Sequence, residues 1–407
     1  MSILVLNSGS SSIKYELFKA EPLTRLASGL VEKIGEELSM LTHMTYSNQG
    51  QPAEYNKKLR VPDHTAALNC IVEVLLNPKH GAVKDSSDIM AVGHRVVHGG
   101  ETFNSTTVID DDVIKAIKEN IRLAPLHNPP NLKGIEIAKK IFPNAIQVAV
   151  FDTAFHHSIP KKAFLYAIPL RLYKEEKIRR YGFHGTSHSY VAEQAAKFLH
   201  RPFNTLNLIT IHLGNGASMA AVRQGRCIDT SMGMTPLEGL VMGTRSGDID
   251  PALPFFLADQ LEMSYQAINE LLNRESGLKG LCGTNDMRTL LEMKSHGDRN
   301  ASLALEVYCY RIKKYIGAYY AALGPLDALV FTAGIGENSP EVRELACEGL
   351  EHMGISIDNE KNYSASSDTR DISTESSKVR VLVIPTDEEL KIAMETLRAI
   401  KEKSQEG

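Results

Sequence analysis

Two segments that begin about 200 residues apart repeat one order of elements, and this repeat constrains the fold more than any other sequence feature. They are LVLNSGSSSIKYELF, from Leu4, and ITIHLGNGASMAAVR, from Ile209. Each places an apolar run, a turn rich in Gly, Ser and Asn, and a second apolar run in succession. Polarity alternates after both turns, which is typical of β-hairpins. The repeat therefore predicts two halves of similar construction.

Other β-branched runs alternate with segments of helical spacing. Apolar runs begin at residues 89, 145, 206, 327 and 379. Helical periodicity predicts helices over residues 65–76, 111–122, 134–141, 190–199, 254–273 and 301–323. Strands that alternate with helices in this way indicate an α/β fold.

Charge and composition exclude several classes of partner. The net charge is -4 and there is no long basic tract, so we expect neither nucleic acid nor an anionic membrane as partner. The five cysteines are scattered without a CxxC pair, which predicts reduced packing residues rather than a zinc site. The sequence has no run of about 18 apolar residues and no signal-like start, so we expect a cytoplasmic protein.

Three glycine-rich turns are candidates for phosphate binding. The first, around Ser10 and Lys14, lacks the second glycine of a P-loop, so it is either an ordinary hairpin or a hairpin whose turn amides face a phosphate. The second, HLGNGAS from His212, has two glycines that let the backbone approach a bulky ligand. The third, FTAGIGENSPEVR from Phe331, opens a helix near Pro340. Three such turns together favour a nucleotide site.

The segment IPTDEEL near the C-terminus carries two carboxylates with different expected roles. Thr386 and Glu389 have the spacing of a capping box, so Glu389 is expected to be structural. Glu388 is left either as a hard oxygen ligand for Mg²⁺ or as a solvated surface residue.

The middle of the chain is irregular and dense in chemistry. Asp152 follows an apolar strand, where ligands gather in open α/β sheets. His184 and Arg245 lie beside glycines in long irregular segments, which often carry function, although a lone histidine is commonly structural. Arg95 stands among apolar neighbours, so it needs a carboxylate of the protein or of a substrate.

With these residues in place, the chain resembles the acetate kinase family, within the superfamily of sugar kinases, heat-shock chaperones and actin. The resemblance runs nearly end to end through eight segments: LNSGSSSIKY, GHRVVHGG, FDTAFH, RRYGFHGTSH, HLGNGAS, DTSMGMTPLEGLVMGTRSGDIDP, FTAGIGENS and IPTDEEL. It implies two duplicated ribonuclease H-like domains of the actin and sugar-kinase type with a nucleotide cleft between them. The expected N-terminal domain is 1–151 plus 385–407, and the expected nucleotide-binding domain is 152–384.

The resemblance also implies an activity, a reversible Mg²⁺-dependent transfer of phosphate from ATP to acetate that gives ADP and acetyl phosphate, in a homodimer. Mn²⁺ is an alternative metal. It assigns catalysis to Asp152, His184 and Arg245, and metal binding to Asn7 and Glu388. It assigns acetate binding to Arg95, Val97, Leu126, Phe183 and Pro236. The residues implied for ATP are Ser10, Ser12, Lys14, His212, Leu213, Gly214, Asn215, Gly216, Asp286, Met287, Arg288, Gly334, Ile335, Gly336, Glu337 and Asn338.

Two alternatives stay open. A kinase for propionate or butyrate differs only in the acyl pocket, where one methylene is worth about 1–3 kcal/mol. An ATPase of the same superfamily would hydrolyse ATP without transfer to an acid.

Overall fold

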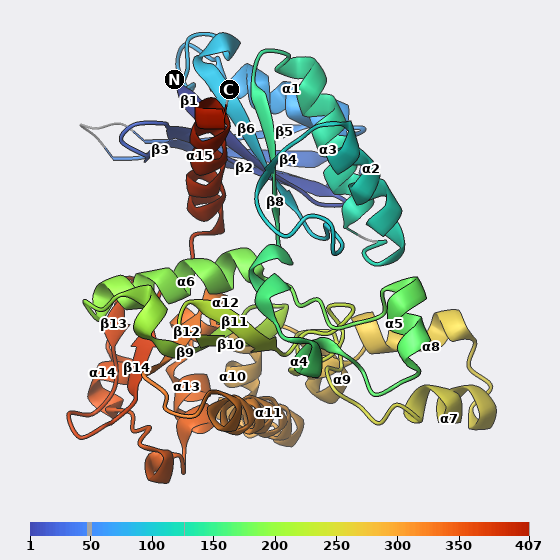
Figure 1. Ribbon diagram of the computed structural model, residues 1–407, viewed down its shortest axis with the longest axis vertical. Coiled ribbons are helices and arrows are strands. Elements are labelled where there is room, and N and C mark those ends of the chain that lie inside the picture. The colour runs from blue at the N-terminus through green and yellow to red at the C-terminus, as the bar shows by residue number, and fades with distance from the viewer. Residues whose placement is uncertain (47–50, 126, 407) are drawn as a thin grey trace. The chain divides into compact units, whose positions relative to one another are not determined.

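The computed structural model describes residues 1–46, 51–125 and 127–406. The chain forms two compact units, and each contains one sheet (Figure 1). The first unit comprises residues 1–154 and 387–407, and the second comprises residues 155–386. The second unit is thus inserted between two parts of the first.

The sheet of the first unit has β1 near its middle. The strands are β1 (Ser2–Ser8), β2 (Ser12–Lys19), β3 (Thr24–Glu32), β4 (Ser39–Thr45), β5 (Ala53–Leu59), β6 (Ile89–Val96), β7 (Thr107–Val108) and β8 (Ile146–Phe151). Their order is β5-β4-β3-β2-β1-β6-β8-β7. β1 pairs antiparallel with β2 and parallel with β6, so the predicted first hairpin is confirmed.

The sheet of the second unit repeats this plan. Its strands are β9 (Asn207–Leu213), β10 (Ala217–Arg223), β11 (Arg226–Thr230), β12 (Ala328–Thr332), β13 (Arg370–Asp371) and β14 (Arg380–Val383), in the order β11-β10-β9-β12-β14-β13. The series β11-β10-β9-β12-β14 matches β3-β2-β1-β6-β8 in order and in the antiparallel or parallel sense of every pairing. The two halves of similar construction are therefore confirmed.

Helices cover both faces of the first sheet. They are α1 (His64–Leu75), α2 (Asp111–Glu119), α3 (Asn128–Ile141) and α15 (Glu388–Glu406). Alternate residues of β1 face opposite sides, as a strand requires. Leu4 and Leu6 join a core that includes residues of α1 and α3, whereas Ile3 and Val5 pack with residues of α15 (Figure 1). The returning C-terminal helix is thus part of the first unit's core.

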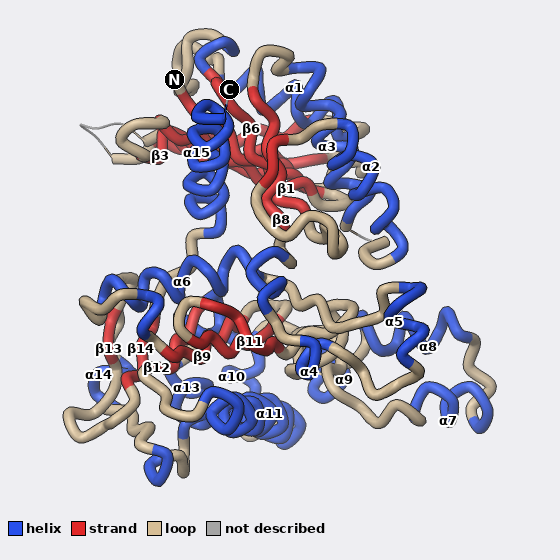
Figure 2. The backbone as a smooth tube through the Cα atoms, viewed as in Figure 1, coloured by secondary structure: helices blue, strands red, loops and turns tan. Residues whose placement is uncertain are grey.

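The second unit is richer in helices. They are α4 (Lys161–Phe164), α5 (Leu170–Glu176), α6 (Gly185–Phe198), α7 (Leu253–Gln260), α8 (Tyr265–Arg274), α9 (Gly277–Cys282), α10 (Met287–Ser295), α11 (Arg299–Leu323), α12 (Ala333–Asn338), α13 (Pro340–Cys347) and α14 (Asn359–Tyr363). Within this unit α6 lies on one face of the sheet and α11 on the other (Figure 1). Residues 231–252 form a long segment without helix or strand (Figure 2).

Two sequence predictions of local structure are wrong. The helix expected over 254–273 is split into α7 and α8, because Glu262 adopts φ +52° and Ser264 caps a new helix by accepting from Ala267 N. The expected capping box does not open α15. Asp387 Oδ1 accepts from Leu390 N instead, and Thr386 Oγ1 bonds Ser187 Oγ. A carboxylate one residue closer to the helix is the stronger acceptor for its N–H groups.

Two further helices begin earlier than their periodicity indicates. α3 starts at Asn128 and includes Pro129 and Pro130 in its first turn, where a missing N–H removes no helical bond. α6 starts at Gly185, directly after His184. Among the described residues, every helix is too short or too polar to cross a membrane.

Candidate active site

The first unit gathers charged side chains at the ends of neighbouring strands. Arg95 lies in β6 and Asp152 directly follows β8, the strand beside it. Arg95 Nη2 lies 2.6 Å from Asp152 Oδ2 and Nε lies 3.0 Å from the same oxygen. Arg95 Nη1 donates to Asn7 Oδ1 at 3.4 Å, and Asn7 stands near the end of β1. The protein itself therefore supplies the carboxylate partner that Arg95 needs.

These bonds use three of the five N–H donors of the Arg95 guanidinium. Burial by itself lowers the pKa of Arg95, but the charges of Asp152 and Glu388 outweigh burial and hold this pKa above its ordinary value. The side chain of Asp152 is 2% exposed and that of Arg95 is 22% exposed, so the carboxylate is shielded from water while the guanidinium stays partly accessible. Arg95 thus remains a cation that can bind a second anion.

The start of α15 adds two carboxylates to the first unit. Burial raises the pKa of Glu388 to about 7; Arg95 opposes this shift, whereas Asp152 and Glu389 add to it. Glu389 Oε2 lies 2.7 Å from Lys14 Nζ in β2. Glu389 is therefore structural, as expected, but through an ion pair rather than a capping box.

Two asparagines of α3 hold the strand ends in place. Asn131 Nδ2 donates to Ser8 O at 2.8 Å, while its Oδ1 accepts from Val97 N at 3.1 Å. Asn128 exchanges hydrogen bonds with the backbone of His98. Sequence reasoning missed both residues, although the proline pair that starts α3 lies between them.

In the second unit, histidines surround the turn between β9 and β10. His184 precedes α6 in the left-handed conformation at φ 55°, and its ring stacks on His212 with 4.2 Å between centroids. His184 Nδ1 and His188 Nε2 both bond Ser218 Oγ, at 2.9 and 2.7 Å. Burial lowers the pKa of His188 well below its ordinary value, so this ring is neutral. The network fixes the orientation of the His184 ring.

The β9–β10 turn runs beside Arg245. A Cβ on Gly216 would lie 3.4 Å from His184 Cε1 and 3.5 Å from Arg245 Nη1. Arg245 donates to Pro236 O at 3.2 Å and to Met242 Sδ at 3.6 Å, both uncharged acceptors. Over the described ranges of the chain, no carboxylate lies within ion-pair distance of Arg245, and burial lowers its pKa. A half-buried cation without an acidic partner is suited to an anionic ligand.

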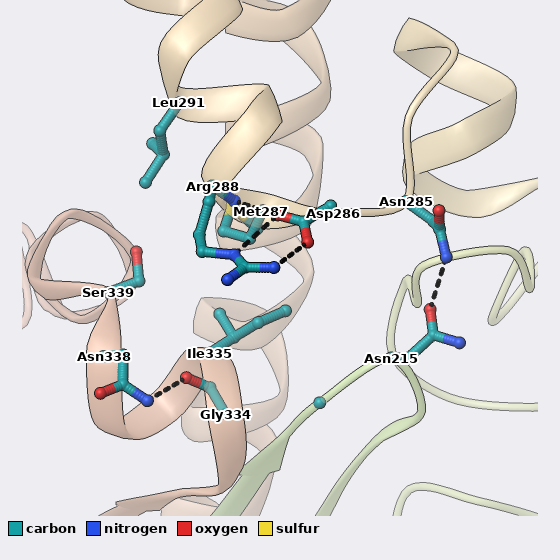
Figure 3. Close-up of a pocket in the computed structure, with 11 residues that line it drawn as sticks. Asn215, Asn285, Asp286, Met287, Arg288, Leu291, Gly334, Ile335, Asn338 and Ser339 are labelled. Carbon is teal, nitrogen blue, oxygen red and sulfur yellow. Dashed lines mark hydrogen bonds and ion pairs between the residues drawn. The ribbon is translucent and has the colours of Figure 1, made fainter. Parts of the chain in front are cut away.

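A cavity of about 670 Å³ opens beside this turn within the second unit (Figure 3). Its walls come from the β9–β10 turn, the start of α10, and α12 with the residue after it. The lining residues are Gly214, Asn215, Asn285, Asp286, Met287, Arg288, Leu291, Gly334, Ile335, Asn338 and Ser339. Asp286 caps α10 and is paired with Arg288 Nη2 at 2.7 Å (Figure 3). Bonds from Arg288 and Thr289 lower the pKa of Asp286 to about 2.

The cavity brings together eight of the sixteen residues that the family resemblance implies for ATP: Gly214, Asn215, Asp286, Met287, Arg288, Gly334, Ile335 and Asn338. Asn285, Leu291 and Ser339 also line it and were not predicted. Gly336 and Glu337 are not in its wall, and Glu337 Oε1 accepts from Thr386 N instead. His212 and Leu213 end β9, while Ser10, Ser12 and Lys14 belong to the β1–β2 hairpin of the first unit.

The residues expected to surround a methyl group fall in both units. Val97 is buried in the first unit, and Phe183 is buried in the second, where Pro236 is partly exposed. Leu126 lies outside the described residues.

Three comparisons with known proteins agree on the family of this chain. The model of the Acetokinase family matches residues 2–394. The acetate kinase of Lawsonia intracellularis is 51% identical over 400 residues, which cover 98% of this chain and 99% of that protein. The crystal structure of Porphyromonas gingivalis acetate kinase has a TM-score of 0.92 at 45% identity and covers 98% of this chain and 99% of its own. A propionate kinase from Francisella tularensis has a TM-score of 0.90 at 43% identity, with 98% and 99% coverage.

Proposed function

Since the chain belongs to the acetokinase family, we propose that it transfers the terminal phosphoryl group of ATP directly to acetate, reversibly, to give acetyl phosphate and ADP. The chain is thus proposed to be an acid kinase whose acceptor is a carboxylate. Each unit is proposed to bind one of the two substrates.

The second unit is proposed to hold the nucleotide. The cavity between α10 and α12 is of a size suited to a small-molecule ligand, and its walls include Gly334, where an added Cβ would meet no atom within 4 Å. Asp286 to Arg288 and Gly334 to Asn338 would bind adenosine and ribose. The turn from His212 to Gly216 would bind the phosphates, and Ser10, Ser12 and Lys14 would line the path of the terminal phosphate.

The first unit is proposed to hold the acid. Arg95 would bind the acetate carboxylate with donors that Asp152 and Asn7 leave available. Val97, Leu126, Phe183 and Pro236 would form the apolar wall around the methyl group. Acetate is an anion at neutral pH, so the nucleophile needs no general base. The two hydrogen bonds that Asp152 accepts from Arg95 support an orienting role for this carboxylate rather than proton transfer.

The physical obstacle is repulsion between two anions. Two like charges 4 Å apart repel by about 4 kcal/mol at an effective dielectric constant near 20. Arg95, Arg245 and Lys14 supply positive charge, and His184 is held beside Arg245 by its bond to Ser218. We propose that Arg245 and His184 stabilise the transferring phosphoryl group.

The metal proposed is Mg²⁺, with Mn²⁺ as an alternative. Asn7 and Glu388 offer an amide and a carboxylate oxygen, hard donors of the kind that Mg²⁺ prefers. Within the described part of the chain, no group of three or more His, Cys, Asp or Glu side chains is arranged for a metal, which suits an ion held mainly by phosphate and water. When bound, the metal supplies charge neutralisation at the phosphates.

One observation carries the proposal. Arg245 is half-buried beside Gly216 and His184 and donates to uncharged acceptors, so its positive charge is available to an anionic ligand. The test is the kcat/KM for acetate, propionate and butyrate with Mg²⁺-ATP, measured as acyl phosphate formed. Acetate is expected to be preferred over propionate by about tenfold or more. A preference for propionate would favour the alternative suggested by the Francisella tularensis relative. ATP hydrolysis that no acid accelerates would indicate a non-transferring ATPase.

We extend the proposal to a homodimer in the cytoplasm. Exposed apolar side chains gather on α7 and α8, including Phe255 at 70% and Tyr265 at 81% exposure. Such a patch is typical of a surface that a second copy covers.

A further inference from the structure

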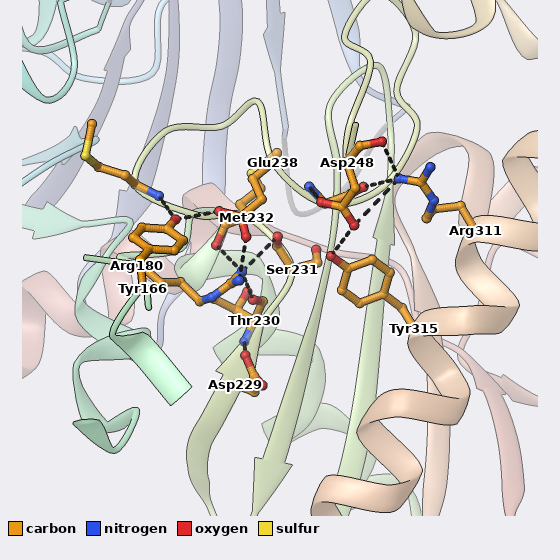
Figure 4. Close-up of polar contacts among 12 residues, drawn as sticks. Tyr166, Arg180, Asp229, Thr230, Ser231, Met232, Glu238, Asp248, Arg311 and Tyr315 are labelled. Atoms are coloured by element: carbon orange, nitrogen blue, oxygen red, sulfur yellow. Dashed lines mark hydrogen bonds and ion pairs between the residues drawn. The ribbon is translucent and has the colours of Figure 1, made fainter. Parts of the chain in front are cut away.

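The segment that carries Arg245 is held by side chains that the proposed reaction does not use (Figure 4). Residues 231–248 contain neither helix nor strand, yet Ser231, Met232, Leu240 and Met242 are completely buried. Buried backbone without secondary structure needs hydrogen-bond partners from elsewhere. Two arginines supply many of them.

Arg180 holds the first part of this segment. Its Nη1 donates to the carbonyls of Thr230, Ser231 and Met232 at 2.7, 3.1 and 3.3 Å. Its Nη2 lies 2.5 Å from Glu238 Oε1 (Figure 4). One guanidinium thus joins the end of β11 to the middle of the segment.

Tyr166 completes the cluster from the loop between α4 and α5. Its hydroxyl donates to Glu238 Oε2 at 2.5 Å and accepts from Met234 N at 2.8 Å. Burial and the charge of Glu238 raise the pKa of Tyr166, so the hydroxyl keeps its proton. The fit is tight, because a Cβ on Gly233 would lie 1.7 Å from Glu238 Oε2 and 2.3 Å from the Tyr166 hydroxyl.

The other end of the segment is closed separately by α11. Gly239 N donates to Asp248 Oδ1 at 2.8 Å, and Asp248 N donates to Gly239 O at 3.0 Å. Arg311 Nη1 bonds both carbonyls of this pair, and the Tyr315 hydroxyl bonds Asp248 Oδ2 (Figure 4). Between these two anchored ends lies Pro236, whose carbonyl accepts from Arg245 Nη1.

We infer that Tyr166 and Arg180 are positioning residues which, through Glu238, fix the carbonyl of Pro236 and thereby the guanidinium of Arg245. Glu238 lies two residues from Pro236, so a shift of its carboxylate moves the acceptor that holds Arg245. The inference rests on the proposed role of Arg245 in phosphoryl transfer. A misplacement of about 1 Å at such a group is enough to slow a reaction substantially.

Tyr166→Phe tests the inference, because it removes the hydroxyl and keeps the ring. We expect kcat for acyl phosphate formation to fall about tenfold, while the KM for ATP stays within about twofold. In an Arg245→Ala background the same change should lower kcat no further, since the two residues then act through one group. Equal losses in both backgrounds, or no loss in the wild-type background, would overturn it.

Tyr363→Phe is the matched control. Its hydroxyl also donates to a glutamate of the second unit, Glu344 Oε2 at 2.7 Å, but this pair joins α14 to α13 and includes no residue of 231–248. We expect wild-type kcat and KM from this control. If Tyr166→Phe does not fold, Glu238→Gln replaces it, because the amide keeps the size and loses the charge that pairs with Arg180.

A calorimetric measurement separates this inference from the proposed function. Wild-type protein that forms no acyl phosphate would contradict the proposed function alone. The affinity for inorganic phosphate is then measured in the wild type and in Arg245→Ala. The difference between the two is the part of the affinity that depends on Arg245. Tyr166→Phe should weaken that part at least threefold, and an unchanged phosphate affinity would overturn the inference.

Discussion

The surroundings of Arg95 and of Arg245 differ in how the charge of each arginine is balanced. In the first unit Arg95 pairs with Asp152, Lys14 with Glu389, and Arg25 with Glu16 and Asp387. In the second unit Arg245 donates to a carbonyl and a thioether. The first arrangement is stable without a ligand, whereas the second leaves a positive charge for an anion to neutralise. The ion pairs of the first unit fix the positions of the charged side chains, whereas the uncharged acceptors of Arg245 leave its positive charge available to an anionic ligand.

The largest expected effect comes from Arg245→Ala. We expect kcat to fall by about 10² or more with little change in the KM for ATP, because the guanidinium acts mainly in the transition state. The free energy of unfolding should change by less than about 1 kcal/mol, since the acceptors of Arg245 in the described residues, Pro236 O and Met242 Sδ, are uncharged. Steady-state kinetics and urea unfolding measure both. An unchanged turnover would remove Arg245 from its proposed role and end the contrast with Arg95.

Asp152→Asn, unlike Arg245→Ala, should cause a large loss of stability. The change leaves Arg95 without its carboxylate and is expected to cost about 3 kcal/mol of unfolding free energy. Activity should also fall, with a larger change in the Mg²⁺ dependence than in the pH profile, as expected of a carboxylate that orients groups rather than protons. A normal Mg²⁺ response together with a shifted pH optimum would return Asp152 to acid–base chemistry.

A smaller effect tests a buried histidine of the first unit whose hydrogen-bond partner is a neutral side chain. His94 bonds Gln147 Oε1 at 2.8 Å, and burial lowers its pKa to about 4. The unfolded chain therefore takes up a proton first as the pH falls below about 6.5, and the stabilisation present above that pH is lost toward pH 4. Between pH 7.5 and 5 this loss is about 2 kcal/mol.

His94→Gln should reduce that pH dependence by the same amount, as measured by urea unfolding at the two pH values. The exposed His352, changed to Gln, is the control for the substitution itself. An equal pH dependence in His94→Gln and the wild type would show that His94 titrates normally.

The fold is more predictable from the sequence than the contacts that hold the side chains of the candidate site in position. The hairpins at residues 4 and 209 are visible because strand alternation and turn composition are local. The partner of Arg95 was left open between protein and substrate, since pairing with Asp152 joins residues 57 positions apart. Tyr166 was missed for the same reason, because its contact with Glu238 spans 72 positions. A neutral side chain in a loop gives no periodic signal, and the contacts that define its role form only in the folded chain.

The insertion of the second unit between Ala154 and Asp387 has a consequence for synthesis of the chain. Ile392, Ala393 and Ile400 of α15 belong to the same core as Ile3 and Val5. A ribosome therefore makes the strands of the first sheet well before α15, and the face that packs on α15 stays uncovered until that helix is made. The inserted unit is made before that helix, so all of its residues are available for folding while one face of the first sheet still lacks its cover.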